Sequence, residues 1–293
     1  MKIIRSIKEM SNFSQMMHIK GKTIGFVPTM GALHEGHLTL IRQVHKENDI
    51  VVVSIFVNPI QFGPKWLWLK EAKPRSSGLE DYRRYPRNLK LDAQLCEKAG
   101  ADVIFCPEAQ QMYPGSYKTY VNVSDLSDCL CGKFRPGHFK GVATVATKLF
   151  NIVNPDIAYF GQKDAQQAII VKKTVGDLNI PVQIKVMPTI REKDGLAMSS
   201  RNAYLNKEER QDATVLYQAL ILAKNLIREG NINASDIIRK MRQLINKKKR
   251  AQIQYILIVD LKDLKPVDKI RDKVLVALSV WIGKTRLIDN IIT

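Results

Sequence analysis

The chain has 293 residues, of which 45% are hydrophobic and 25% charged, and its formal net charge is +18. This composition is typical of a globular protein with one large or two ordinary domains. No apolar stretch approaches the roughly 20 residues that a membrane-spanning helix needs, so we expect no membrane partner. The charge favours salt-sensitive attraction to nucleic acid. However, no aromatic residues interleave with the compact basic block Lys247–Arg250, so we expect no specific nucleic-acid partner.

The termini and cysteines give a further expectation. The N-terminus, Met1–Arg5, lacks an apolar segment long enough for a secretory signal. The four cysteines form no Cys-x-x-Cys pair, and Cys129-x-Cys131 alone is a weak indication of metal or redox chemistry. We therefore expect a cytoplasmic protein with reduced thiols.

Strand and helix patterns alternate along the first two thirds of the chain. Runs rich in Val, Ile or aromatic residues predict strands at Thr23–Thr29, Ile50–Asn58, Asp102–Cys106 and Ala158–Phe160. Apolar residues at helical spacing predict helices at Gly36–Asn48, Asn88–Ala99, Val142–Val153 and Asp164–Leu178. The alternation predicts an α/β fold, a Rossmann-like parallel sheet with flanking helices. Ligands of such sheets bind at the carboxyl ends of the strands.

The pattern changes near Pro188. Two long helices are predicted at Lys207–Arg228 and Ala234–Lys249, and two strands at Tyr255–Leu261 and Lys273–Ile282. We therefore predict two domains, an α/β domain over residues 1–187 and a smaller C-terminal α+β domain over residues 188–293.

The segment Pro28–His37, Pro-Thr-Met-Gly-Ala-Leu-His-Glu-Gly-His, connects a predicted strand to a predicted helix. A helix start has unpaired N–H groups and the positive end of the helix dipole, and His34 and His37 add further donors. This combination favours a nucleotide triphosphate site. A metal site built on His34-x-x-His37 lacks a third ligand at sensible spacing, and a purely structural pair of histidines stays open.

A second chemical segment, Asp194–Asn202, is rich in hydroxyl groups and contains Arg201. Serine N–H and O–H groups and a guanidinium suit β- and γ-phosphates. Taken alone, the segment is equally consistent with an ordinary turn in which serine caps a helix.

Further motifs follow in a fixed order along nearly the whole chain. They are Asn58-Pro-Ile-Gln-Phe62, Tyr85-Pro-Arg87, Arg135-Pro-Gly-His-Phe139, Tyr159-Phe-Gly-Gln-Lys-Asp-Ala-Gln-Gln167 and Gly283-Lys-Thr-Arg-Leu-Ile-Asp-Asn290. Together with the two segments above, they resemble the pantothenate synthetase (pantoate–β-alanine ligase) family, within the His-x-Gly-His nucleotidyltransferases.

The resemblance implies a two-step ligation by a homodimer. Pantoate carboxylate attacks the α-phosphate of Mg-ATP, giving pantoyl adenylate and pyrophosphate. The amine of β-alanine then attacks the mixed anhydride, giving pantothenate and AMP. Because two anions meet in the first step, catalysis requires positioning and charge neutralisation.

The resemblance also implies roles for individual residues. His34, His37, Lys163 and Arg201 would be catalytic, with His37 as proton donor, and Gln61 and Gln167 would hold pantoate. The implied ATP-binding residues are Met30, Gly31, Ala32, Leu33, His34, Glu35, Gly36, His37, Gly161, Gln162, Lys163, Asp164, Ile190, Met198, Ser199, Ser200 and Arg201. We expect Mg²⁺ to bind mainly through the triphosphate, without a dedicated protein site. Asp92 is interpreted as a helix-surface residue rather than an outer-shell ligand.

Relative to the family, Lys65–Leu79 is an insertion near the expected substrate mouth. It contains two of the three tryptophans, followed by Pro-Arg-Ser-Ser-Gly. Core packing or a surface loop is the favoured interpretation, and a partner contact or a lid that excludes water stays open.

Two other functions also stay open. A related nucleotidyltransferase that adenylylates a phosphate ester would leave Gln61 and Gln167 without a use. A basic RNA-binding module is favoured only by the net charge.

Overall fold

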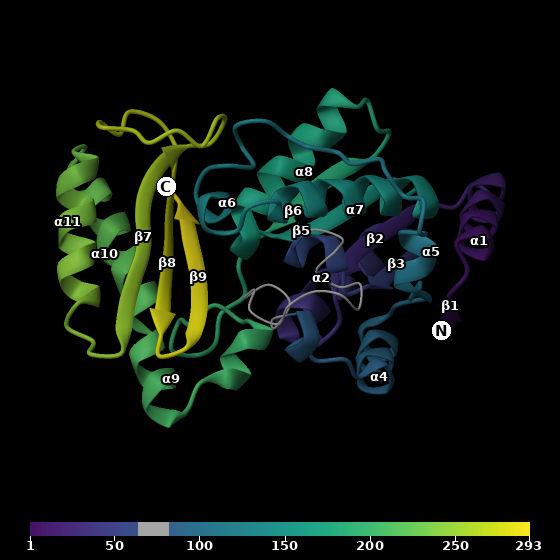
Figure 1. The fold of residues 1–293 in the computed structure, drawn as a ribbon, viewed down its shortest axis with the longest axis horizontal. Coiled ribbons are helices and arrows are strands. Elements are labelled where there is room, and N and C mark those ends of the chain that lie inside the picture. The colour runs from purple at the N-terminus through teal and green to yellow at the C-terminus, as the bar shows by residue number, and fades with distance from the viewer. Residues whose placement is uncertain (64–81) are drawn as a thin grey trace.

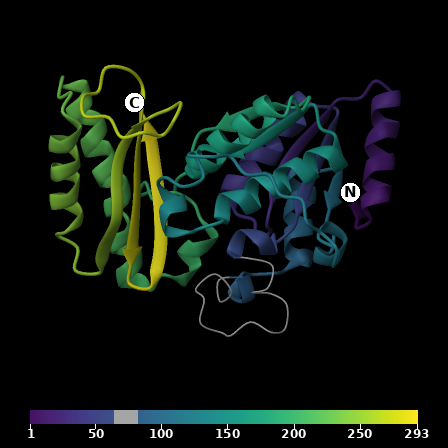
Figure 2. The ribbon, with the colours of Figure 1, turned by 45° about the horizontal axis from the view of Figure 1, so that its top comes forward.

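The computed structural model describes residues 1–63 and 82–293, so the predicted insertion Lys65–Leu79 lies outside the described residues. Figures 1 and 2 show two units side by side, an N-terminal unit built on a parallel sheet and a C-terminal unit built on an antiparallel one. Among the described residues, no helix is both long and apolar enough to cross a membrane.

The N-terminal unit contains β1 (Lys2–Ile4), α1 (Ile7–Ile19), β2 (Ile24–Thr29), α2 (Glu35–Glu47), β3 (Ile50–Ile55), η1 (Pro59–Phe62), α4 (Leu89–Ala99), β4 (Val103–Phe105), α5 (Ala109–Met112), α6 (Cys131–Phe134), α7 (His138–Val153), β5 (Ile157–Gly161), η3 (Gln162–Asp164), α8 (Ala165–Asp177) and β6 (Gln183–Met187). The C-terminal unit contains η4 (Ser200–Tyr204), α9 (Lys207–Ala213), α10 (Val215–Arg228), α11 (Ala234–Ile245), β7 (Ala251–Asp260), β8 (Val274–Ile282) and β9 (Thr285–Ile292).

The order of the parallel sheet creates a ligand crevice. The strands lie in the order β1-β4-β3-β2-β5-β6, and all neighbouring pairs are parallel. The chain extends the sheet from β2 through β3 to β4 on one side, and then adds β5 and β6 on the other. The carboxyl ends of β2 and β5 therefore flank the point at which the order reverses, where sheets of this class bind ligands. The predicted fold class is confirmed.

The central strands are buried on both faces, as parallel strands between helical layers are. Because successive side chains of a strand point to opposite faces, Phe26 and Val52 join a core with residues of α7 and α8. Their neighbours Val27, Val51 and Val53 join a second core with residues of α2 and α4.

The antiparallel sheet also packs on both faces, which joins the two units. On β8, Val276 and Leu278 pack with residues of α10 and α11, the helices that lie against the sheet in Figure 1. The alternate residues Leu275 and Ala277 belong to the core of the N-terminal unit, as does Tyr255 of β7. The two sheets are therefore held together by shared apolar packing.

Two predicted helices differ from the observed ones. The pattern at Lys207–Arg228 predicts one helix, but α9 and α10 are separate, and at their junction the Thr214 hydroxyl donates to the Gln211 carbonyl at 2.8 Å. Such local bonds compete with the helical ladder. The helix predicted to reach Lys249 ends at Ile245. The following basic residues pair across to α9, with Lys248 3.6 Å from Asp212.

The sequence patterns do not predict β1, α1, β6 or β9. β1 has only three residues. None of the residues of the edge strand β6 is fully buried, so it lacks the apolar run that marks a central strand. In β9 the apolar residues are interrupted by Arg286 and by the pair Asp289 and Asn290, and this pair is buried because of tertiary contacts.

One close backbone contact sets the position of α7 against η1. A Cβ at Gly141 would lie 2.6 Å from both the N and the Cα atom of Gln61. We therefore predict that Gly141→Ala lowers the free energy of unfolding by about 2 kcal/mol, because backbone must move to relieve the overlap. Urea unfolding measures this change.

Gly176→Ala in α8 is the matched control, since no heavy atom lies within 4 Å of its added Cβ. That variant should gain about 0.5–1 kcal/mol, because alanine restricts the unfolded chain and favours the helix. Equal stability changes in the two variants would contradict the packing argument.

Candidate active site

A cleft with a cavity volume of about 190 Å³ opens at the carboxyl ends of β2 and β5. Segments that are distant in sequence contribute to its lining. They are the β2–α2 loop with Met30, His34 and His37, η1 with Gln61, η3 and the start of α8 with Lys163, Asp164 and Gln167, and the region before α9 with Ser199, Ser200 and Arg201. Both chemical segments of the sequence therefore meet in one site.

Asp92 shapes the β2–α2 loop. Its two carboxylate oxygens accept the backbone N–H groups of Ala32 and Leu33, at 3.0 and 2.8 Å. Gly31 has φ +79°, and a Cβ there would lie 2.8 Å from the Asp92 carboxylate, so glycine is required at this position. The interpretation of Asp92 as a helix-surface residue is wrong, because its side chain is buried and holds this loop.

The two histidines cap the N-terminus of α2. The His34 backbone N–H donates to His37 Nδ1 at 3.4 Å, and the Gly36 N–H donates to His34 Nδ1 at 3.2 Å. The rings lie side by side, with centroids 4.2 Å apart. Because each Nδ1 accepts a hydrogen bond, each ring proton lies on Nε2. The helix start thus offers imidazole N–H donors, whereas the expected unpaired amides at His34 and Gly36 are already bonded within the loop.

Both imidazoles are neutral at pH 7. Burial, the Lys163 ammonium and, more weakly, the opposing Asp164 carboxylate set the pKa of His34 at about 4. Burial, together with His34 and Lys163, lowers the pKa of His37 to about 3. A neutral ring still donates one hydrogen bond, so the pair can bind an anion without first taking up a proton.

A buried hydrogen-bond chain orients the amide of Gln61. Tyr113 Oη donates to Asn58 Oδ1 at 2.8 Å, and Asn58 Nδ2 donates to Gln61 Oε1 at 3.1 Å. Asn58 Nδ2 also donates to the Gly141 carbonyl, and His138 Nδ1 contacts the Gln61 carbonyl at 2.9 Å. With its oxygen engaged, Gln61 has its Nε2 donors available, one of which contacts Met30 Sδ at 2.9 Å. The amide is therefore arranged as a hydrogen-bond donor.

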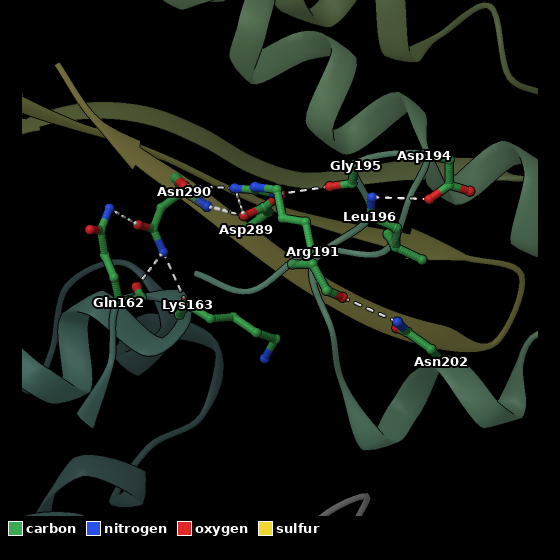
Figure 3. A network of polar contacts seen from close by, with 10 residues as sticks. Gln162, Lys163, Arg191, Asp194, Gly195, Leu196, Asn202, Asp289 and Asn290 are labelled. Carbon is green, nitrogen blue, oxygen red and sulfur yellow. Dashed lines mark hydrogen bonds and ion pairs between the residues drawn. The ribbon is translucent and has the colours of Figure 1, made fainter. Parts of the chain in front are cut away.

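Figure 3 shows how the loop of residues 191–201, here called the clamp loop, is fixed to the rest of the site. Arg191 forms a bidentate pair with Asp289 of β9, at 2.6 and 3.0 Å, and donates to the Gly195 carbonyl at 3.0 Å. Next to Asp289, Asn290 donates to the carbonyl groups of Gln162 and Lys163, at 3.0 and 2.8 Å. β9 therefore holds the clamp loop and the loop after β5 in one frame.

Positive charge dominates the cleft. Lys163 lies 3.7 Å from Asp164, and Arg135 and Arg201 also line the cleft. Among the described lining residues, Asp164 is the one carboxylate. A site with this charge balance favours a polyanion.

The structure separates the expected ATP-binding residues into two groups. Those that line the cleft are Met30, His34, His37, Lys163, Asp164, Ser199, Ser200 and Arg201, joined by the expected pantoate residues Gln61 and Gln167. The others shape the surrounding loops or lie beside them: Gly31, Ala32, Leu33, Glu35, Gly36, Gly161, Gln162, Ile190 and Met198. Glu35, for example, is exposed and pairs with Arg42.

Sequence reasoning missed several residues that hold the site. Asn58 and Asn290 fall inside the motifs quoted above, so the sequence marks them without giving a role. Tyr113 and Arg191 belong to none of those motifs, and their importance follows only from the contacts that they make.

Comparisons with known proteins agree with this geometry. A profile of the Pantoate-beta-alanine ligase family matches residues 2–292. The chain belongs to this family. It is 53% identical to a pantothenate synthetase of Caldicellulosiruptor saccharolyticus, over the whole of this chain and 99% of that protein.

Solved structures of pantoate–β-alanine ligases have the same fold. The Thermus thermophilus enzyme is 39% identical with a TM-score of 0.89, and the match covers 99% of both chains. The Francisella tularensis enzyme, complexed with β-γ ATP and β-alanine, is 35% identical with a TM-score of 0.76, and the match covers 99% of this chain and 97% of that one.

The contacts of Asp92 give a test of the β2–α2 loop. We predict that Asp92→Asn lowers the free energy of unfolding by about 2 kcal/mol, because an amide offers one acceptor where two buried N–H groups need partners. Amide hydrogen exchange of residues 31–33 should accelerate. Glu97→Gln, on the exposed surface of the same helix, is the control. Unchanged exchange in the Asp92 variant would refute the assigned role.

The half-buried histidines of the β2–α2 segment predict a pH dependence of stability. Their pKa values lie below the ordinary 6.5, so between pH 6.5 and 4 the unfolded chain binds protons that the folded protein does not. The free energy of unfolding should therefore fall as the pH is lowered through this window. His37→Gln removes one such group and should show a shallower fall in urea titrations at pH 7 and pH 5. Parallel curves would contradict the depressed pKa of His37.

Proposed function

We propose that this protein condenses pantoate with β-alanine at the expense of ATP, through a pantoyl adenylate, and releases AMP and pyrophosphate. The observation that carries the proposal is the meeting of phosphate-type donors (His34, His37, Lys163 and the clamp loop) with the amides of Gln61 and Gln167 in one cleft. Membership of the pantoate–β-alanine ligase family supports the same reaction.

The first step joins two anions, so charge neutralisation is its main requirement. We assign Lys163 and Arg201 to the phosphate oxygens, supported by their place in the cleft lining. His34 and His37 donate Nε2–H bonds to the same oxygens. A triphosphate beside these rings raises their pKa, since an anion favours the cationic imidazole. His37 then serves as the proton donor to the departing pyrophosphate.

Gln61 and Gln167 hold pantoate in this proposal. The Gln61 amide presents donors, which suits the hydroxyl and carboxylate oxygens of pantoate. A pantoate carboxylate oxygen attacks the α-phosphorus, and the bond to the β-phosphate oxygen breaks. In the second step, the β-alanine nitrogen attacks the acyl carbon, loses its proton, and AMP leaves with the bonding electrons of the anhydride.

The remaining ATP assignments follow the family resemblance. Residues of the β2–α2 loop, Gly161–Asp164, Ile190 and Met198–Arg201 would surround the nucleotide, with some acting through the shape of their loops. Mg²⁺ would enter on the triphosphate. Asp164, the single carboxylate among the described lining residues, fits an ion held mainly by phosphate and water oxygens.

We also infer that the protein is a homodimer in the cytoplasm, and that its two domains meet between residues 187 and 188. Family resemblance supports the first two. The end of the parallel sheet at Met187 supports the domain boundary.

The test is pyrophosphate–ATP exchange measured without β-alanine. Exchange should require pantoate, because pyrophosphate returns to ATP only by reversal of adenylate formation, and the adenylate contains pantoate. His37→Ala and Lys163→Ala should each lower it about 100-fold or more, since preorganised donors to developing charge contribute at least that much.

Lys172→Ala, on the exposed side of α8, is the control for a lost lysine. Urea unfolding checks that each variant is folded. Exchange without pantoate, or near-wild-type exchange in both site variants, would refute the proposed reaction or the assigned roles.

A further inference from the structure

A second cavity continues the cleft into the joint between the two units. This vestibule extends to Tyr255 and Arg286 of the C-terminal sheet, and it shares with the cleft Arg135, His138, Lys163, Asp164, Gln167 and Arg201. Leu275 and Ala277 of β8 add apolar surface to its wall. The vestibule is therefore a half-apolar chamber that opens beside Gln167, one of the two proposed pantoate amides.

A β-bulge fixes the guanidinium of Arg286 at this chamber. The β7–β8 register shifts between Ile253 and Tyr255, which leaves Gln254 as the extra residue. Bulges re-aim side chains and are frequent next to active sites. Here Gln254 Oε1 accepts from Arg286 Nε at 2.8 Å and from the buried Ser279 hydroxyl at 3.1 Å. The Gln254 amide that orients Arg286 is thus itself fixed by Ser279.

The other described contact of Arg286 is also to a neutral group. Its Nη2 donates to Cys131 Sγ at 3.3 Å, and this thiol in turn contacts the Tyr255 hydroxyl at 3.1 Å. Asp289 lines the vestibule too, but it forms its bidentate pair with Arg191. Because neither the amide nor the thiol is a counter-ion, the half-buried Arg286 guanidinium can form its ion pair with an anionic ligand.

We propose that Arg286 binds the carboxylate of β-alanine. The two methylene groups of β-alanine then lie on Leu275 and Ala277, and its amine points toward Gln167. The inference rests on the proposed function and deepens it. The vestibule lining contains Gln167, and of the proposed phosphate donors it contains Lys163 and Arg201, which line both cavities, but not His34, His37, Ser199 or Ser200. The chamber therefore lies on the acyl side of the adenylate, where the amine must approach.

Arg286→Gln provides the test. The KM for β-alanine should rise about tenfold or more, while pantoate-dependent pyrophosphate–ATP exchange stays within about twofold of wild type, because no β-alanine takes part in it. β-Alaninamide, which lacks the carboxylate charge, gives a second readout. The wild type should prefer β-alanine strongly, and the variant should lose most of that preference. Arg286→Lys should restore part of it.

Gln254→Glu tests the same idea without removing the arginine, since the new carboxylate pairs with Arg286 and competes with the ligand. It should also raise the KM for β-alanine selectively. Lys284→Gln, an exposed residue of the same hairpin, is the charge-matched control. A parallel loss of exchange, or a raised KM for ATP, would assign Arg286 to phosphate and overturn the proposal. An unchanged KM for β-alanine would also overturn it. Absence of pantoate-dependent exchange in the wild type would instead refute the proposed function.

Discussion

The buried ion pair between Arg191 and Asp289 is the contact on which the geometry of the site depends. The Asp289 side chain is 1% exposed, and burial raises its pKa, while the guanidinium opposes that shift. Removal of one partner from such a pair typically costs about 3–5 kcal/mol, because the remaining charge stays buried. Through Asn290, the same strand also holds the backbone of Gln162 and Lys163. Two loops that supply cations to the cleft, one from each unit, are therefore positioned by one strand of the C-terminal unit.

This frame concentrates positive charge without matching it with carboxylates. Lys163, Arg135 and Arg201 line a cleft in which Asp164 is the one acidic group among the described residues. The protein limits the resulting repulsion by keeping His34 and His37 neutral, since burial and the nearby ammonium lower the pKa of both. A polyanionic substrate would complete this charge balance, so binding and protonation of the imidazoles are coupled.

The groups that face the substrates are oriented by hydrogen-bonded chains of polar residues behind them, and not by their own contacts alone. Tyr113 and Asn58 fix the orientation of the Gln61 amide, and Ser279 and Gln254 fix the orientation of the Arg286 guanidinium. A rotated amide would leave buried donors facing donors, so each chain has one favourable arrangement. These supporting residues place donors where the two substrates are expected to react.

The sequence by itself determined the α/β class, the strands and helices around the cleft, the family, and the two segments that meet there. Those features depend on local periodicity and on motifs, which are properties of neighbouring residues. Only the tertiary structure decided that Asp92 is buried beneath the β2–α2 loop, that Asn290 links β9 to Lys163, and that a bulge aims Gln254 at Arg286. The partners in these contacts are 32 to 127 residues apart. Their side chains meet because separate elements pack on a shared core, and no local pattern records which distant residue will be the neighbour.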